Sequence, residues 1–212
     1  MRPVWSLLLA ILCIGCTHGV FSYPSLRLRY QSTAPQATFK GNLFLQNPNI
    51  TFLQDFVPPY YQHKYTQAFQ KDSATLLARL GYISTPNAPS AHLRGQIRLA
   101  FESTPPTLKE TKAMLKASGN DYIDPVRVLR MLRAQSTLTL ECIQNAHFPC
   151  GIQVHVQVLE PVWRANPLDS DPSAHATDEQ RYNTALIETL NKLYQQSLQA
   201  LESALKKPTP KE

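Results

Sequence analysis

The chain has 212 residues, of which 43% are hydrophobic and 17% are charged. This composition is too apolar for wholesale disorder, and only seven glycines exclude a collagen-like chain. The formal net charge of +6 favours acidic partners, such as sulfated or sialylated sugars or anionic lipid, without requiring any of them.

The first sixteen residues have the pattern of a secretory signal. Arg2 is the only charged residue, and Val4–Gly15 is almost continuously apolar. That run of about a dozen residues is shorter than the roughly 20 that a membrane-spanning helix needs, so we predict that residues 1–15 are a signal peptide. A small residue, Gly15, directly precedes Cys16 after a leucine-rich run, and this arrangement resembles the lipobox of bacterial lipoproteins.

The lipobox resemblance implies that Cys16 is acylated and becomes the mature N-terminus. A single acyl chain gives only marginal attachment to a bilayer, whereas the three chains of such lipoproteins would be an essentially permanent anchor. Thr17 rather than Asp follows the cysteine, which by analogy with enteric sorting implies the outer membrane. Ordinary secretion, with cleavage near Gly19, is the alternative. The predicted organisation is a signal peptide at residues 1–15, a lipidated tether at 16–24, a single α+β domain at 25–207 and a tail at 208–212.

Periodic patterns predict the elements of the first half of the domain. Ser25–Tyr30 alternates strictly and predicts a half-buried strand with Arg27 and Arg29 facing outward. Tyr60–Leu80 has apolar residues at helical spacing and predicts a helix. Leu93–Phe101 alternates again and predicts a second strand. Two short apolar runs, at residues 42–46 and 50–53, are separated by a turn signal.

The second half is predicted to contain two short helices and a hairpin. Thr107–Ala117 is compatible with a short helix, and an Asp-Pro pair predicts a helix from Asp124 to Arg133. Ser136–Ile143 and Ile152–Leu159 alternate and predict a β-hairpin. Pro161–Ala176 is expected to be a polar loop in which Trp163 is exposed or half-packed.

The last predicted element is a long C-terminal helix. Thr177 and Gln180 have the spacing of a capping box, and apolar residues then keep a helical period over five turns: Ile187, Leu190, Tyr194, Leu198, Leu201 and Leu205. Strands separated by helices, with one antiparallel hairpin, predict an α+β fold: a mixed, mainly antiparallel sheet with helices packed on one face.

Cys142 and Cys150 flank a short loop between the two strands of the predicted hairpin. Residues placed across a hairpin lie within disulfide reach, and an exported protein meets an oxidising compartment. We therefore predict a disulfide between them. A Cys–His nucleophile that uses His147 is the alternative, although unpaired thiols are unusual in exported proteins.

Several local strings resemble those of the neuraminyllactose-binding hemagglutinin lipoproteins of gastric and enterohepatic bacteria, which are also described as flagellar-sheath adhesins. The resemblance covers most of the mature chain. It begins at Cys16 and includes Leu26-Arg27-Leu28-Arg29-Tyr30, Leu76-Leu77-Ala78-Arg79-Leu80-Gly81-Tyr82, Phe148-Pro149-Cys150-Gly151-Ile152, Leu159-Glu160-Pro161 and the helix around 185–205.

The family resemblance implies surface display and recognition of sialylated or sulfated glycans. The family's proposed sugar-binding motif is a basic run just after a strand, and the corresponding candidates here are Lys109, Lys112 and Lys116. Glu110 lies among them, and the segment offers no arginine for bidentate binding of a carboxylate. A solvated charged face is the alternative interpretation of this segment.

We find no signature of catalysis. The six histidines lack metal-binding helical spacing, and neither a nucleophile elbow nor a phosphate-binding glycine loop is present. Asp169-Ser170-Asp171 lacks the glycine and distal glutamate of a calcium loop, and no basic-aromatic rhythm indicates nucleic-acid binding. We therefore predict no enzyme activity, no cofactor and no metal.

Three functions remain open from the sequence. The first is an outer-membrane or flagellar-sheath surface lipoprotein that is adhesin-like or structural, anchored in the bilayer and in contact with host glycoconjugates. The second is a periplasm-facing accessory lipoprotein that binds an envelope protein partner. The third, a hydrolase or redox enzyme, would use Cys142, Cys150 and His147.

Overall fold

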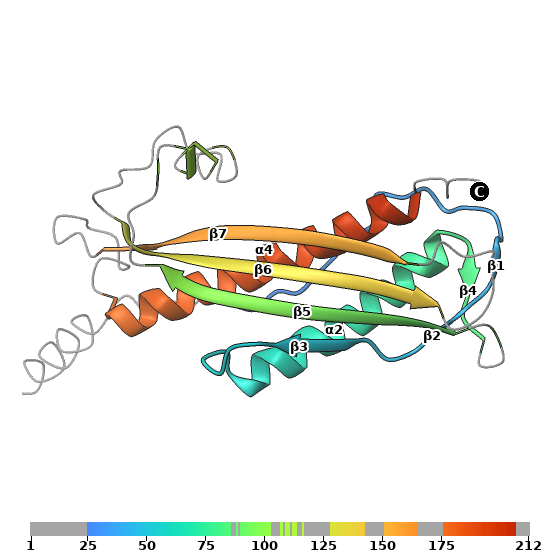
Figure 1. Cartoon of the computed structure of the whole chain (residues 1–212), viewed down its shortest axis with the longest axis horizontal. Coiled ribbons are helices and arrows are strands. Elements are labelled where there is room, and N and C mark those ends of the chain that lie inside the picture. Colours follow the sequence, from blue (N-terminus) through green and yellow to red (C-terminus); the bar gives the residue numbers. More distant parts are fainter. Residues whose placement is uncertain are drawn as a thin grey trace, which may run out of the picture.

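The structure, a computed structural model, describes residues 25–85, 88, 90–102, 107, 109–110, 112–113, 116, 128–142, 151–164 and 176–206. Three long strands run side by side, and two helices lie along one face of the sheet that they form (Figure 1). The predicted fold class is therefore confirmed: a mixed, mainly antiparallel sheet with helices on one face and a long C-terminal helix.

The sheet combines three long antiparallel strands with two short parallel additions. The long strands pair in the order β5-β6-β7, and both β2 and β3 join β5 in parallel. A separate parallel pair is formed by β1 and β4. The bounds are β1 Gly41–Asn42, β2 Phe44–Leu45, β3 Asn49–Phe52, β4 Tyr82–Ile83, β5 Ser90–Glu102, β6 Val128–Cys142 and β7 Ile152–Trp163.

Alternation along the long strands separates a buried face from a polar face. Successive side chains of a strand point to opposite sides of the sheet, so every second residue of β5 and β6 enters the core: Ala91, Leu93, Ile97 and Leu99, then Leu132, Ala134, Leu138 and Leu140. The intervening residues, such as Arg94, Gln96 and Arg98, are exposed as predicted. This second face, on the side opposite the helices, is called the outer face below.

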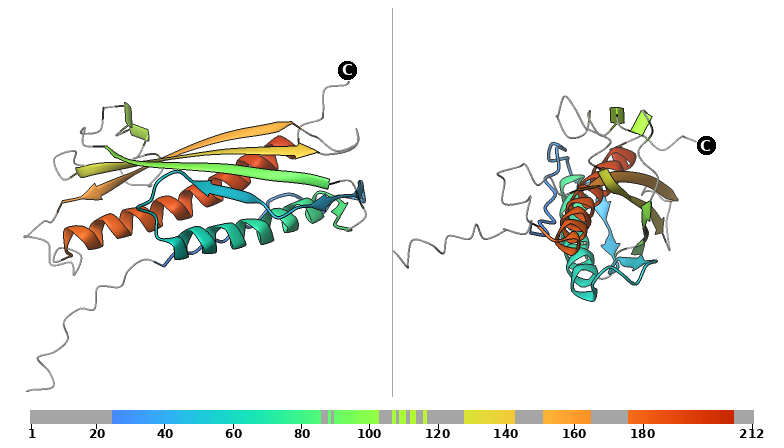
Figure 2. Two further views of the ribbon diagram at one scale, coloured as in Figure 1. Left: turned by 60° about the horizontal axis from the view of Figure 1, so that its bottom comes forward. Right: turned by 90° about the vertical axis from the view of Figure 1, so that its left-hand side faces the viewer.

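Two helices, α2 (Pro59–Arg79) and α4 (Asp178–Lys206), cover the buried face of the sheet (Figure 2, left). The predicted apolar stripe of the C-terminal helix is buried along its whole length. The predicted capping box is present: the Thr177 N–H donates to Gln180 Oε1 at 2.7 Å, and the Gln180 N–H donates to Thr177 Oγ1 at 3.2 Å.

The prediction of a strand at residues 25–30 is wrong, although its inside-outside pattern is right. Leu26 is buried and both arginines are exposed, yet the segment 25–40 has no regular secondary structure. Its backbone bonds to helix side chains instead of a neighbouring strand: the Arg27 N–H donates to Asn191 Oδ1 at 2.8 Å, and the Tyr30 N–H to Asp72 Oδ2 at 3.1 Å. The segment is therefore an extended strap, residues 25–40, across the helices.

The predicted helix from Asp124 to Arg133 is also wrong where the structure describes it, because residues 128–133 begin β6. Leu132 is paired with a residue of β5 on one side and of β7 on the other. These two ladders supply backbone partners that override the local cap signal. The predicted loop from Pro161 also begins later than expected, because β7 continues to Trp163. Pro161 is tolerated within β7 because β7 is an edge strand.

A glycine closes the junction between α2 and β4. Gly81 has φ of +95°, and a Cβ there would lie 2.2 Å from the carbonyl oxygen of Thr38. Its own carbonyl accepts from the Lys40 N–H at 2.8 Å. The strap can therefore pass close to the end of α2 only because residue 81 has no side chain.

Candidate functional site

The lysine segment, Lys109, Lys112 and Lys116, lies on the outer side of the sheet, opposite the helices (Figure 2, left). The described residues 109, 110, 112, 113 and 116 are helical, as predicted. Arg133 of β6 ties this segment to the sheet, because its guanidinium contacts Glu110 at 3.0 Å and Glu102 of β5 at 2.6 Å. An ion pair between the strands and the segment therefore sets its position.

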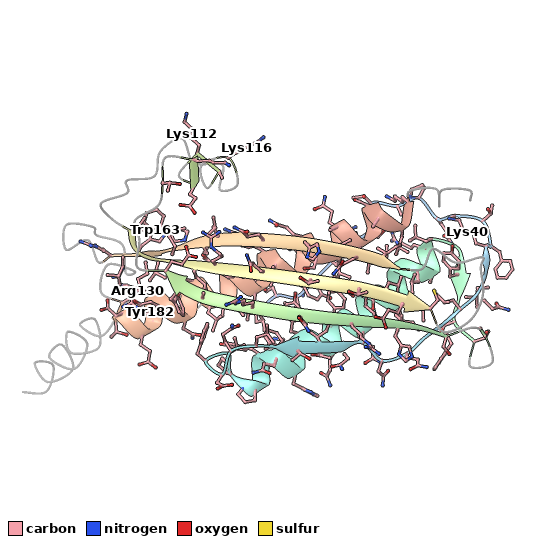
Figure 3. The ribbon with its side chains drawn as sticks, in the orientation of Figure 1. Lys40, Lys112, Lys116, Arg130, Trp163 and Tyr182 are labelled. Carbon is pink, nitrogen blue, oxygen red and sulfur yellow. The ribbon has the colours of Figure 1, made fainter. Side chains whose placement is uncertain are left out.

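The lysines themselves are exposed. The side chains of Lys112 and Lys116 point away from the sheet (Figure 3). Hydrogen bonds from the backbone and hydroxyl of Thr107, together with Arg133, lower the pKa of Glu110. The carboxylate of Glu110 is thus engaged on the sheet side, and the ammonium groups are left to solvent. The segment can therefore attract an anion.

A groove of about 930 Å³ opens on the other side of the molecule, where the strap crosses the helices. The strap contributes Arg29 to its lining, α2 contributes Lys71, and α4 contributes Gln195 and Gln199. The complete lining is Leu28, Arg29, Tyr30, Gln31, Thr33, Ala68, Lys71, Asp72, Gln195 and Gln199. The groove therefore presents amides and two exposed cations, a set that suits a polar ligand with negative charge.

Two carboxylates of the helices hold the part of the strap that lines this groove. Asp72 of α2 accepts from the hydroxyl of Tyr194 at 2.7 Å and from the Tyr30 N–H at 3.1 Å. Glu202 of α4 accepts from the Tyr30 hydroxyl, and from Thr33 Oγ1 at 3.1 Å. Since Tyr194 is fully buried, these bonds connect the strap to the aromatic core between the helices.

The electrostatics of these carboxylates favour the ionised form at Glu202. Burial alone would raise the pKa of Glu202, but hydrogen bonds from Lys206, Tyr30 and neighbouring hydroxyls outweigh that effect and lower the pKa to about 2. Burial, together with the bond to Asp72, raises the pKa of the Tyr194 phenol well above its ordinary value. The tyrosine therefore stays neutral and acts as a donor.

A second buried carboxylate links α4 to β7. Glu160 is 6% exposed and pairs with Lys192 Nζ at 2.5 Å. Burial raises the pKa of Glu160, and the attraction of Lys192 offsets only part of this rise. The pair lies between the helix and the sheet and joins them structurally.

Of the predicted cysteine sites, only Cys142 lies within the described residues, at the end of β6. Cys16, Cys150 and His147 lie outside the described residues, so acylation, the disulfide and the alternative nucleophile stay predictions. In the described part of the hairpin, Leu140 is opposite Ile152. Asp169-Ser170-Asp171 also lies outside the described residues.

The described residues contain neither a helix suited to crossing a membrane nor a cluster of metal-binding side chains. None of the helices in the described part of the chain is long and apolar enough to cross a membrane. No group of three or more His, Cys, Asp or Glu side chains that could hold a metal ion occurs among those residues.

Comparison with solved structures shows a fold shared with a hemagglutinin homolog. The structure is similar to a protein from Helicobacter pylori described as a neuraminyllactose-binding hemagglutinin homolog, with a TM-score of 0.57 and 12% identity over 87% of this chain and 93% of that chain. A hypothetical protein from Chlamydia trachomatis follows with a TM-score of 0.42 and 8% identity, covering 79% of this chain and 98% of that chain. A DUF330 protein from Xanthomonas campestris has a TM-score of 0.37 and 9% identity, covering 85% and 94%.

No protein-family model matches the sequence, and no curated protein matches it. The likeness to the hemagglutinin homolog is thus one of fold, which agrees with the resemblance found in the sequence. At 12% identity it does not extend to a ligand.

The groove was missed in the sequence. Arg29 is recognisable there as an outward residue of an alternating segment, but nothing local connects it with Lys71, Gln195 or Gln199, which are distant along the chain. Amphipathic patterns mark which residues are exposed; they do not show which exposed residues share a groove.

Proposed function

We propose that this chain is an exported lipoprotein of the outer membrane or flagellar sheath that acts as an adhesin-like or structural envelope protein. The observation that carries the proposal is the fold shared with the hemagglutinin homolog across 87% of this chain. The signal-like segment and Cys16 support it, because together they resemble the start of a bacterial lipoprotein. The proposal includes no catalytic step.

Lipid attachment is tested by metabolic labelling with a palmitate analogue in cells that produce either the wild type or Cys16→Ser. We expect label on the wild type and none on the variant, since the acylated thiol is then absent. Equal absence of label in both would contradict the anchoring. Surface proteolysis of intact cells then separates display from a periplasmic location: degradation supports display, and complete protection favours the alternative, a periplasm-facing accessory lipoprotein.

For glycan recognition, we propose the lysine segment as the contact. Three exposed ammonium groups on the outer side of the sheet supply positive charge, while Glu110 is occupied by Arg133. The test compares binding of sialylated, sulfated and neutral oligosaccharides to immobilised protein. The variant replaces all three lysines by Gln, and the matched control, Arg94→Gln with Arg98→Gln, removes two exposed cations from the same side. Loss of acidic-sugar binding in the lysine variant alone supports the assignment; equal binding of neutral sugars contradicts it.

We also propose the disulfide between Cys142 and Cys150. The described register pairs residues 140 and 152. If the ladder continues, residues 142 and 150, two positions further on each strand and on the same face, are also opposite one another. Closing so short a loop would contribute about 2 kcal/mol. Thiol titration of the denatured, non-reduced protein should find neither cysteine free; two free thiols would exclude the bond and reopen the nucleophile alternative.

A further inference from the structure

The strap and α2 together carry a local excess of positive charge. The strap carries three cations and no carboxylate, and α2 adds three cations against one carboxylate. By contrast, α4 carries four carboxylates and three cations. The single carboxylate of α2, Asp72, faces the buried hydroxyl of Tyr194 and the strap rather than a cation. The strap and α2 therefore form a basic surface.

The cations of this surface lack ionic partners. Among the described residues, no ion pair involves Arg27, Arg29, Lys64, Lys71 or Arg79, whereas Lys192 and Lys206 of α4 are both paired. Exposed cations left without carboxylates keep their full attraction for an external anion.

An exposed aromatic residue lies among these cations on α2. Tyr60 is 67% exposed. Lys64 and Lys71 follow Tyr60 by four and eleven residues, so the 3.6-residue helical period places all three on the same side of α2. The Lys64 ammonium lies 5.9 Å from the Tyr60 ring centroid. This stripe is opposite the buried residues Tyr65 and Phe69. A tyrosine flanked by lysines is the composition found where helices meet a membrane interface.

The chain enters the described structure on this same surface. The Ser25 carbonyl accepts from Asn191 Nδ2 at 3.3 Å, and the strap lies on the side of the helices away from the sheet (Figure 2, right). Only eight residues separate Ser25 from Cys16, a reach of roughly 27 Å when fully extended. Arg27 and Arg29 follow directly. A lipid on Cys16 would thus keep the basic surface next to the bilayer.

We propose that the strap and the outward side of α2 lie against a membrane surface rich in anionic phospholipid, with a headgroup phosphate held in the groove between Arg29 and Lys71. This inference rests on the proposed lipid anchor. The same orientation directs the lysine segment away from the bilayer, since that segment lies on the opposite side of the sheet. The helix surface is then the membrane side, and the outer face is the side open to ligands or partners.

The experiment is a lysine footprint of the full-length, lipid-anchored protein. It is reconstituted into vesicles of phosphatidylglycerol with phosphatidylcholine, or of phosphatidylcholine alone, and acetylation is quantified by mass spectrometry. We expect Lys64 and Lys71 to react several-fold more slowly in the anionic vesicles, and Lys109, Lys112 and Lys116 to react equally in both. Unchanged reactivity of Lys64 and Lys71, or protection of the other three instead, would overturn the proposal.

A charge-reversal variant tests the assigned cations. Arg29→Glu with Lys71→Glu should abolish the protection of Lys64, whereas the matched control Arg94→Glu with Arg98→Glu on the outer face should keep it. High salt should also remove the protection, because the Debye length falls to about 3 Å at 1 M. Protection of Lys64 that survives both the reversal and high salt would show a contact that is not electrostatic, and would overturn the proposal. The wild-type footprint decides the question even where a variant does not fold.

The palmitate experiment separates this inference from the proposed anchor. If Cys16 is not acylated, co-sedimentation of the full chain with the same vesicles still measures the basic surface, and neutralising two cations by Arg29→Gln with Lys71→Gln should weaken binding roughly 10- to 30-fold. Binding without acylation supports the surface and refutes the anchor. Acylation without the footprint refutes the surface and leaves the anchor intact.

Discussion

The pairing of cations with carboxylates differs between the two sides of the sheet. On the outer face, Arg94 lies 3.5 Å from Glu141 on the neighbouring strand, and Arg133 joins Glu102 and Glu110. On the strap and α2, the described cations have no carboxylate partner, and the two carboxylates bonded to the strap, Asp72 and Glu202, accept from tyrosine hydroxyls.

This difference follows from geometry. Antiparallel strands fix the distances between side chains that are opposite or diagonal to one another, so cross-strand pairs form within the sheet. Arg94 with Glu141 and Arg133 with Glu102 are diagonal pairs, and Thr137 with His155 is a directly opposite pair at 3.0 Å. The strap crosses the helices without regular pairing, so its arginines have no fixed opposite residue. Two arginines of the outer face are therefore paired within the sheet or with the segment beside it, whereas the described cations of the strap and α2 are open to an external anion.

Removal of a core residue between the helix and the sheet should have the largest effect. Leu190→Ala creates a cavity at a position with no exposed surface, and we expect the free energy of unfolding to fall by about 2–5 kcal/mol. Gln157→Ala on the outer face should change it by less than about 0.5 kcal/mol. Urea denaturation measures both, and equal effects would contradict the assignment of the core to one side.

Lys192→Met should make stability depend strongly on pH. Burial raises the pKa of Glu160 in the folded state, so folding favours its protonated form, and stability is lost as the pH rises above about 4.3, the ordinary pKa of glutamate. Without Lys192 the rise in pKa is larger. We expect the variant to be about 3 kcal/mol less stable than the wild type at pH 8 and nearly equal at pH 4.

Denaturation at a series of pH values checks this expectation, with Lys192→Arg as the control that keeps the charge. A variant whose deficit is the same at pH 4 and pH 8 would show that the ammonium acts by packing alone.

Glu202→Gln should loosen the strap with the opposite pH dependence. The pKa of Glu202 is depressed to about 2, so its contribution is present at neutral pH and is lost as the pH falls from about 4 towards 2. We expect a loss of about 1–3 kcal/mol at pH 7, with the difference from the wild type shrinking in acid. Chemical denaturation measures the loss, and hydrogen exchange at residues 25–40 should increase.

Glu141→Gln is the matched control for that variant, because it removes an exposed carboxylate of the outer face. Unchanged exchange in the strap of Glu202→Gln would refute its role in holding the strap.

The smallest effect is expected from Arg94→Gln. Its ion pair with Glu141 is mostly exposed, and such pairs contribute little because water and salt screen them. The midpoint of thermal unfolding should move by no more than corresponds to about 0.5 kcal/mol. A larger shift would mean that the cross-strand pairs of the outer face stabilise the sheet, and would sharpen the contrast between the two sides.

Local patterns were sufficient for most elements. The helices, the hairpin strands and the strand around Leu99 were predictable because burial repeats at 3.6 or 2 residues. The failures share one cause. The strap alternates as a strand does, and residues 128–133 carry helix-compatible signals, but the state of each was decided by the partners of its backbone: helix side chains for the first, two neighbouring strands for the second.

The candidate sites divide in the same way. The exposure and positive charge of Lys109, Lys112 and Lys116 could be anticipated, whereas the engagement of Glu110 by Arg133 could not, since it joins segments far apart in the chain.

By itself, the sequence determined the fold class, the buried stripe of each helix and the excess of positive charge, because periodicity and composition are local properties. Tertiary structure decided where that charge lies: it placed the strap against α2, paired Arg94 and Arg133 of the sheet with carboxylates, and left the described cations of the strap and α2 without such partners. The reason is that an ion pair or a groove depends on distances between segments, and only packing sets those distances.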